Sequence, residues 1–470
     1  MGSTYVSKGG MSMGKFKYSK EEQEINNVLK YQDEQLKALT TDLAKTSNQT
    51  EAQIEVLEAQ LRLLGIDPSK IESASLSKPS SKEVVIVPSW EMLCAEAESV
   101  VGGNCELESI FTNDEIRSNE LAIKQLRQDY NEVHKLDKWD ITISAIAGIV
   151  AGAMDILLVG IPQRGKAGLE AGSLSNYIRG YFDKILPPDE MEKLANSKES
   201  KVPFDAQDNR NTTIRVEGLS AYYHRLLQLG HDPIIGFIVG VMDIMTGKMT
   251  TIDKTGKFVS QTMENYADRI EPNIFKAIAK ELTHLKSDVT TSMGLPAPLM
   301  GLFNLLQFGS IGEEEQTIAE IVQGMYYEGY DFIQFCASSI PVMLIEVIVR
   351  LCYAIKRIKE GHSIKESIPF SLNREKHPKL ATMLFIAHSA ATGINAGKVY
   401  FTKNPVAINY PQWIAFAKYS FMQLKWAIIN KPAARDAYIE GRIYTELNET
   451  LDDINSSFEA YTKGRIVFYQ

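Results

Sequence analysis

The chain has 470 residues, of which 44% are hydrophobic and 23% charged, and these values exclude a wholly disordered or collagen-like protein. Lysine and arginine number 50, against 59 aspartates and glutamates. The resulting net charge of −9 argues against a nucleic-acid partner, because phosphate contacts need clustered positive charge.

Residues 1–19 are rich in glycine, serine and lysine and lack the apolar core of a secretory signal, so we expect a flexible tail. Four cysteines, at positions 94, 105, 336 and 352, form no C-x-x-C pair and are too sparse for a disulfide scaffold. Reduced thiols in the cytoplasm are therefore expected.

Residues 20–65 carry apolar side chains at the three- and four-residue steps of a heptad repeat. No proline or glycine interrupts this run before Gly65, so the pattern predicts one long helix. Such a helix cannot bury its apolar stripe alone. We therefore expect a coiled coil through which the chain forms a homo-oligomer. The alternative is a long helix packed on its own domain. The apolar positions are Ile25, Leu29, Leu36, Leu39, Leu43, Ile54, Leu57, Leu61 and Leu64.

Residues 66–138 are expected to form a linker and a small α/β segment. The linker, residues 66–83, is rich in serine and lysine and contains Pro68 and Pro79. A short β-like run follows at residues 84–87, and residues 114–138 have the one-sided pattern of a charged amphipathic helix.

Residues 139–435 contain six apolar segments and are predicted to form a large helical domain, followed by a charged helical tail at 436–470. Residues 141–161 and 332–355 reach the roughly 20 residues that a membrane-spanning helix needs. The second of these segments carries Glu346 and Arg350, whose i, i+4 spacing lets them neutralise each other on one helix face. The mean hydropathy of −0.15 is low for a polytopic membrane protein. We nevertheless prefer membrane embedding of at least one segment to a wholly soluble helical domain.

Two apolar segments share the pattern G-x-x-x-G-x-M-D-I. On a helix the two glycines and the aspartate share a face, and a glycine face lets two helices approach closely. A buried acid at the edge of such a contact must be protonated, paired, or facing water or an ion, because an unpaired buried charge is costly. The motif therefore predicts either helix packing with a hydrogen-bonded aspartate or part of an ion or proton pathway. The motif residues are Gly148, Gly152 and Asp155 in the first segment and Gly236, Gly240 and Asp243 in the second.

The sequence contains no recognisable catalytic, cofactor-binding or metal-binding motif. Its seven histidines form no H-E-x-x-H pair, and phosphate-loop and nucleophile-elbow motifs are absent. His284 and Asp288 are spaced i, i+4, which is compatible with a metal site if a third ligand such as His388 came near. We prefer a solvent-facing or helix-capping histidine, and we expect no cofactor and no metal ion.

The sequence thus predicts a mainly α-helical protein with a long N-terminal coiled-coil helix, a short linker with minor β structure, and a large membrane-embedded domain of glycine-faced apolar helices. We expect an oligomeric, membrane-associated protein, such as a pore- or channel-forming effector of the bacterial defence or toxin type. Its expected partners are a second copy of the chain and the lipid bilayer, with most of the chain on the cytoplasmic side. The alternatives are a soluble scaffolding oligomer without membrane contact and an enzyme with an unrecognised site.

Overall fold

The computed structural model describes residues 17–70, 85–103, 105–165, 168–309, 315–462 and 466–468. Within these ranges the protein is mainly helical, with fifteen α-helices and three two-stranded sheets, which confirms the predicted fold class at this level. The chain divides into two compact units, residues 1–130 with 434–470, and residues 131–433. Most of the predicted tail and of the predicted linker lies outside the described residues.

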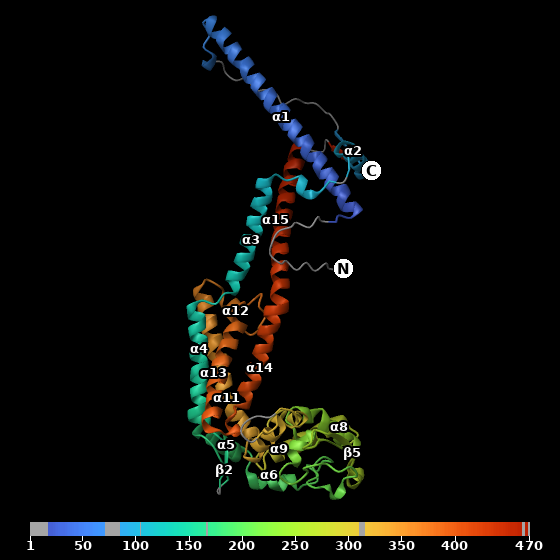
Figure 1. Ribbon diagram of the computed structural model, residues 1–470, viewed down its shortest axis with the longest axis vertical. Helices are drawn as coiled ribbons and strands as arrows, with labels where there is room; N and C mark the ends of the chain where they lie inside the picture. The colour runs from blue at the N-terminus through green and yellow to red at the C-terminus, as the bar shows by residue number, and fades with distance from the viewer. Residues whose placement is uncertain are drawn as a thin grey trace. The chain divides into compact units, whose positions relative to one another are not determined.

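The first unit is built on a long helix, α1 (Lys20–Leu63) (Figure 1). A capping box fixes its start: the Ser19 hydroxyl accepts from the backbone amide of Glu22, whose carboxylate accepts from the amide of Ser19. The helix ends before Gly65, which adopts a positive φ of 79°. The other elements are α2 (Trp90–Val101), most of α3 (Asn113–His134), most of α15 (Lys431–Thr462), and the parallel strands β1 (Val85–Val87) and β6 (Ile466–Phe468).

The predicted heptad stripe of α1 is exposed along most of the helix. Near the N-terminal end α1 packs on α2, where the Tyr31 hydroxyl donates a hydrogen bond of 2.8 Å to Glu96. Further along, five stripe side chains are between 50% and 62% exposed, Leu61 is partly buried, and Leu64 is 75% exposed. Pairing of this stripe in a coiled coil stays a prediction. The five residues are Leu36, Leu39, Leu43, Ile54 and Leu57.

Four long helices of the second unit pack together as a bundle (Figure 1). We call them the bundle helices: α4 (Lys138–Met154), α11 (Phe332–Lys359), α13 (Leu380–Thr402) and α14 (Tyr410–Lys425). Two of them continue into π-helical turns, α4 at Asp155–Val159 and α14 at Trp426–Asn430. α13 contacts both α4 and α14, and α11 contacts all three.

Polar capping residues start three of the four bundle helices, α4, α11 and α14, directly before their apolar stretches. The Asp137 carboxylate accepts from the amide of Asp140 in a capping box at the start of α4. Asp331 accepts from the amide of Gln334 at the start of α11. Asn409 likewise caps α14. Each cap satisfies amide groups that have no partner within the helix, so the helix starts are encoded locally.

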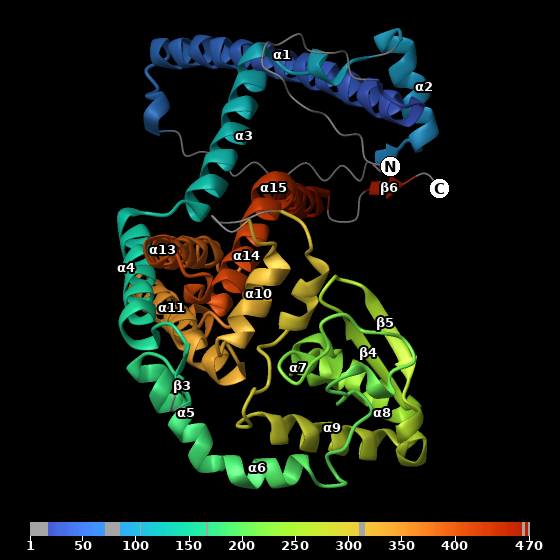
Figure 2. The same cartoon turned by 60° about the horizontal axis from the view of Figure 1, so that its bottom comes forward.

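Residues 173–327 of the second unit form what we call the compact module. In Figure 2, α7, α8 and the hairpin of β4 and β5 gather beside α9. The hairpin is antiparallel, with Lys248 opposite Thr262 and Ile252 opposite Phe258. The module consists of α5 (Ser173–Ile185), α6 (Pro188–Ala195), α7 (His224–Leu227), α8 (Val239–Thr246), β4 (Lys248–Ile252), β5 (Phe258–Thr262), α9 (Ile274–Asp288) and α10 (Ile318–Tyr327). Outside the module, the second unit also contains β2 (Gln163–Gly165), β3 (Gly168–Glu170) and α12 (Ile364–Ser367).

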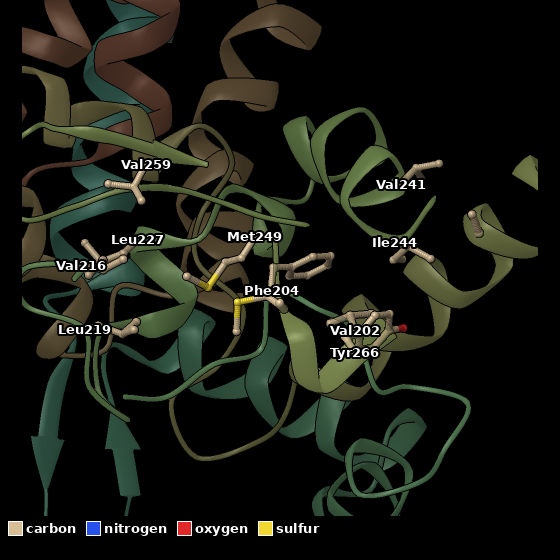
Figure 3. Close-up of a cluster of buried hydrophobic side chains, with 12 residues drawn as sticks. Val202, Phe204, Val216, Leu219, Leu227, Val241, Ile244, Met249, Val259 and Tyr266 are labelled. Atoms are coloured by element: carbon tan, nitrogen blue, oxygen red, sulfur yellow. The ribbon is translucent and has the colours of Figure 1, made fainter. Parts of the chain in front are cut away.

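The core of the compact module consists of large apolar side chains. Phe204 and Met249 lie at its centre, and Ile244 from α8 and Val259 from β5 belong to the same cluster (Figure 3). All four are buried to 98% or more. Burial of this apolar area stabilises the fold of the module.

Two of the six apolar segments form only short helices. Residues 233–247 divide into a 3-10 turn, Ile235–Phe237, and the short helix α8. Residues 295–311 contain the 3-10 helix Met300–Leu305. In the second case Pro296 and Pro298 interrupt the backbone hydrogen bonding, so an α-helix cannot run through.

Candidate functional site

The first glycine motif packs α4 closely against α13. A Cβ atom on Gly148 would lie 2.2 Å from the carbonyl oxygen of Ala387, and one on Gly152 would lie 2.8 Å from the Ile394 side chain. Both distances are shorter than van der Waals contact, so a larger residue at either position would push the helices apart.

Asp155 lies at the end of this helix contact and is only 3% exposed. Its carboxylate has three partners: the Lys398 ammonium at 3.1 Å, the Asn395 side-chain amide at 2.9 Å and the Asn409 side-chain amide at 2.7 Å. Of the states expected for this acid, the structure shows the paired one. The ion pair ties the end of α4 to α13.

The predicted pair of Glu346 and Arg350 is present on α11, with 2.7 Å between the Arg350 Nε and a Glu346 carboxylate oxygen. The Tyr419 hydroxyl of α14 donates a hydrogen bond to the same carboxylate. His388 of α13 places its Nε2 atom 3.6 Å from it. The pair therefore links three bundle helices through one partly buried polar cluster.

The second glycine motif is built differently from the first. Gly236 lies in a 3-10 turn, whereas Gly240 and Asp243 lie on α8, so the three residues do not share one continuous helix as predicted. A Cβ atom on Gly240 would lie 2.7 Å from the Glu281 carboxyl oxygens, and one on Gly236 would lie 2.8 Å from one of them. The two glycines therefore make room for a carboxyl group of α9.

Glu281 and Asp243 are two buried acids without a cationic partner at hydrogen-bond distance among the described residues. Both Glu281 oxygens are buried without a hydrogen bond, and burial, together with the nearby Asp288 and Asp243, raises the pKa of Glu281 well above its usual value. Asp243 accepts two hydrogen bonds of 2.8 Å from the amide and hydroxyl of Thr250. Burial nevertheless raises the pKa of Asp243 to about 7.

A buried cluster of histidine and aspartate side chains lies between α9 and the residues around α7. His231 Nδ1 is 2.8 Å from Asp288 Oδ2, His284 Nε2 is 3.2 Å from His231 Nδ1, and His284 Nε2 is 3.5 Å from Asp288 Oδ2. The helix spacing explains why two of the three side chains are neighbours, because residues 284 and 288 are one turn apart on the inward face of α9. A 3-10 turn, Leu229–His231, supplies the third side chain.

The charges of this cluster are unequal. Burial would raise the pKa of Asp288, but Arg225 at 3.0 Å and the neighbouring histidines hold it well below its usual range. Burial lowers the pKa of His231 to about 4, against the opposing effect of Asp288. At neutral pH the carboxylate is therefore ionised and the His231 ring is neutral.

Of the residues suggested by the sequence, His284 and Asp288 lie together, but His388, the suggested third ligand, lies in the bundle beside Glu346. The expectation of a solvent-facing His284 is wrong because this side chain is buried. The third member, His231, is 53 residues before His284. No local spacing signal links residues so far apart, and only the packing of the module brings them together.

Comparison of the chain with protein-family models, with curated proteins and with solved structures found no match. A function can therefore be inferred only from the residues and their geometry.

Proposed function

We propose that the four bundle helices are embedded in a lipid bilayer and that the protein acts there as a membrane-associated oligomer. The observation that carries this proposal is the outward face of α11. Its side chains at four-residue steps are apolar and between 43% and 59% exposed, although the opposite face of the same helix is also apolar. A helix that is apolar all round belongs in a core or in a membrane. The outward residues are Met343, Val347, Leu351 and Ile355.

Two helical stretches, Asn113–Val159 and Phe332–Lys359, are long and apolar enough to cross a membrane by length and composition. Only 33% and 39% of their most apolar windows are buried. A core helix of a water-soluble protein would bury most of such a window. Partial burial instead fits helices whose remaining apolar surface faces lipid.

The interior of the bundle supports the same proposal. Where α4 meets α13, the contact residues are small, and polar groups such as Asp155 and Lys398 are buried and paired. In lipid the hydrophobic effect does not drive helices together, so close packing of small residues and interhelical polar contacts do so instead. The small buried residues are Ser144, Ala147, Gly148, Ala151, Gly152, Ala387 and Ala391.

One end of the bundle carries the residue types that membrane interfaces favour. The Lys356 ammonium lies 5.4 Å from the centre of the Trp139 ring, and the Arg374 guanidinium lies 4.6 Å from that of Trp426. Tryptophan and basic side chains concentrate at the level of lipid headgroups. This end would then lie at the membrane surface.

Self-association through α1 is the second part of the proposal. Its exposed heptad stripe is self-complementary, since leucine and isoleucine recur at the steps at which parallel helices interlock. A second copy of this chain is therefore the partner. Assembly of several bundles around an axis would give a pore or channel, for which the buried Asp155 and Glu346 clusters are the polar positions.

Membrane fractionation tests the first part. We expect the full-length chain to stay in the membrane pellet after alkaline carbonate extraction and to need detergent for purification. A chain that remains soluble and monodisperse without detergent would contradict membrane embedding and favour the soluble scaffolding oligomer.

A mass measurement tests self-association through α1, and an ion-flux measurement tests the pore. In detergent, the double variant Leu36→Glu/Leu43→Glu is expected to have a lower oligomer mass than the wild type, because charges in the stripe repel; an unchanged mass would remove α1 from assembly. In liposomes, ion flux that is equal with and without the protein would contradict a pore.

A further inference from the structure

Membrane embedding leaves the buried histidine cluster of the compact module unexplained. Three atoms face one another there: Nδ1 of His231, Nε2 of His284 and Oδ2 of Asp288. Whether they attract or repel depends on which of the two ring nitrogens of each histidine carries the proton. In each ring the second nitrogen, which we call the outer nitrogen, points away from these three atoms. The hydrogen-bond partner of the outer nitrogen decides which nitrogen carries the proton.

The outer nitrogen of His284 carries a proton. Its Nδ1 atom lies 2.9 Å from the backbone carbonyl oxygen of Ser200, which can only accept a hydrogen bond. In the neutral ring, Nε2 therefore presents a lone pair to the cluster.

The outer nitrogen of His231 carries a proton for the same reason. Its Nε2 atom lies 3.2 Å from the carbonyl oxygen of Phe204 and 3.2 Å from the side-chain oxygen of Gln228. The Gln228 amide nitrogen donates to the carbonyl of Ala206 at 2.6 Å, which fixes the orientation of its oxygen toward the histidine. Nδ1 of His231 therefore presents a lone pair to Asp288.

With each imidazole protonated on its outer nitrogen, two nitrogen lone pairs and a carboxylate oxygen lie within 3.5 Å of one another. A cation among the three atoms gives each of them a partner. We propose that His231 Nδ1, His284 Nε2 and Asp288 Oδ2 bind a divalent first-row transition-metal ion of the Zn²⁺ type.

Two of the three separations fit this ion. With bonds of about 2.0–2.2 Å to nitrogen and oxygen, the edges of a tetrahedral zinc site are about 3.3–3.6 Å long. The separations of 3.2 and 3.5 Å are close to these edges, whereas the 2.8 Å between His231 Nδ1 and Asp288 Oδ2 is shorter and has to lengthen when the ion binds. Two imidazoles with one carboxylate select a transition metal over Mg²⁺ or Ca²⁺, which prefer oxygen ligands alone.

The surroundings of the three ligands are those of a metal site. Both imidazoles donate their outer N–H to a backbone carbonyl, which is the usual way in which metal-bound histidines are oriented. Arg225 binds Oδ1 of Asp288 at 3.0 Å, which leaves Oδ2 for the ion.

A second, independent observation comes from His224. Its Nδ1 atom contacts the carbonyl of Ala221 at 3.0 Å, and its Nε2 atom is buried without a hydrogen-bond partner among the described residues. This nitrogen lies 3.5 Å from Asp205, and the carboxylate of Asp205, the His224 ring and the His231 ring come close enough for a second set of metal ligands. Metal-ligating side chains therefore extend from the proposed site to His224 and Asp205.

Three protein ligands leave a fourth tetrahedral position for water or a substrate atom. Asp205, at the edge of the cluster, lines a cavity of about 280 Å³ together with Lys201 and Tyr266.

Metal titration of the purified full-length chain tests the proposal. After chelator treatment and dialysis, we expect Co²⁺ to bind at about one equivalent with the intense visible absorption of a tetrahedral site, and Zn²⁺ to displace it. In His284→Gln and Asp288→Asn the affinity is expected to fall at least about 100-fold, because each change removes a ligand. His377→Gln, which alters a buried histidine outside the cluster, is the matched control and should bind like the wild type.

Two outcomes overturn the proposal: a wild-type chain that binds no Co²⁺ or Zn²⁺, or a control that loses binding as the ligand variants do. X-ray absorption of the zinc-loaded wild type keeps the proposal falsifiable if a variant fails to fold. It should show two imidazoles and an oxygen ligand, and a shell of sulfur or of oxygen alone would contradict the assignment. Neither result depends on whether the bundle lies in a membrane.

Discussion

The bundle helices and the compact module of the second unit differ in how their helices pack. In the module, large apolar side chains such as Phe204 and Met249 form the core. The bundle also buries large apolar side chains of α11 and α13, but α4 meets α13 through small residues, and the charged pair of Asp155 and Lys398 lies inside. On the outward face of α11, apolar side chains such as Val347 and Leu351 stay exposed at four-residue steps.

The module buries its apolar area, which stabilises a fold in water. With the proposed embedding in a bilayer, the bundle follows the rule for lipid, in which apolar side chains can stay outside and polar groups must find partners inside.

The largest effect is expected from removing the cation of the buried pair. Lys398→Met leaves the Asp155 carboxylate buried without a counter-charge, which we expect to cost about 3–5 kcal/mol of unfolding free energy. Denaturant unfolding of the detergent-solubilised chain measures it. Adding Asp155→Asn to Lys398→Met should recover part of the loss, and no recovery in the double variant would mean that the ion pair is not the cause.

Asp243 is the module's counterpart of Asp155, but without a cationic partner. Because its folded-state pKa of about 7 lies above the ordinary 3.8, the folded state holds the proton more tightly than the unfolded state. The stability contributed by this group should therefore be fully present at about pH 4, fall as pH rises toward 7, and stay low above it, by an amount on the order of 3–4 kcal/mol.

The free energy of unfolding of Asp243→Asn, measured against pH, tests this difference between Asp243 and Asp155. The variant should lose the part of this fall that Asp243 contributes, while Glu281 keeps its own contribution, and it should be more stable than the wild type at pH 8. Asp155→Asn, which removes a paired charge, should instead be less stable than the wild type at pH 8. If the two variants respond alike, the contrast between the two acids is wrong.

The outward face of α11 distinguishes lipid from water directly. Val347→Arg places a charge on that face, which would cost about 2.5–3.5 kcal/mol in a bilayer and reduce membrane insertion. In water, a substitution at a site that is 59% exposed should change stability by less than about 0.5 kcal/mol. The matched control is Leu121→Arg on α3, where the wild-type side chain is 58% exposed. Equal membrane recovery of both variants would count against a lipid-facing surface.

A smaller effect is expected at the glycines of the bundle. Gly148→Ala forces a Cβ atom against the Ala387 carbonyl and should destabilise the bundle by about 1–3 kcal/mol. Gly397→Ala on α13 meets no atom within 4 Å and should stabilise its helix by up to about 1 kcal/mol. Thermal unfolding of the two variants gives the comparison, and equal destabilisation would show that close packing of α4 on α13 is not what Gly148 provides.

The sequence predicted those features that depend on residues close together in the chain. The long helix α1, the helices carrying the apolar segments 141–161 and 332–355, and the pairing of Glu346 with Arg350 all follow from periodicity and i, i+4 spacing. Features that depend on distant residues were not predictable. Lys398 as the partner of Asp155 and His231 as the partner of His284 arise only from tertiary packing.

The repeated motif shows where local similarity stops being informative. Both copies have the same five residues, yet Gly152 faces a neighbouring helix and Gly240 faces a carboxyl group. In the second copy a 3-10 turn interrupts the helix after Gly236, so the shared face is lost. A pattern of residue types fixes a helix face only where the helix itself is continuous.

The most direct test of membrane embedding is a measurement of whether lipid or water contacts position 347. A spin label at Val347→Cys, with the native cysteines replaced and the chain reconstituted in liposomes, should relax rapidly with dissolved oxygen and be protected from a water-soluble nickel reagent. The same label at Leu121→Cys should show the reverse. Ready access of the nickel reagent to position 347 would contradict a lipid-facing bundle.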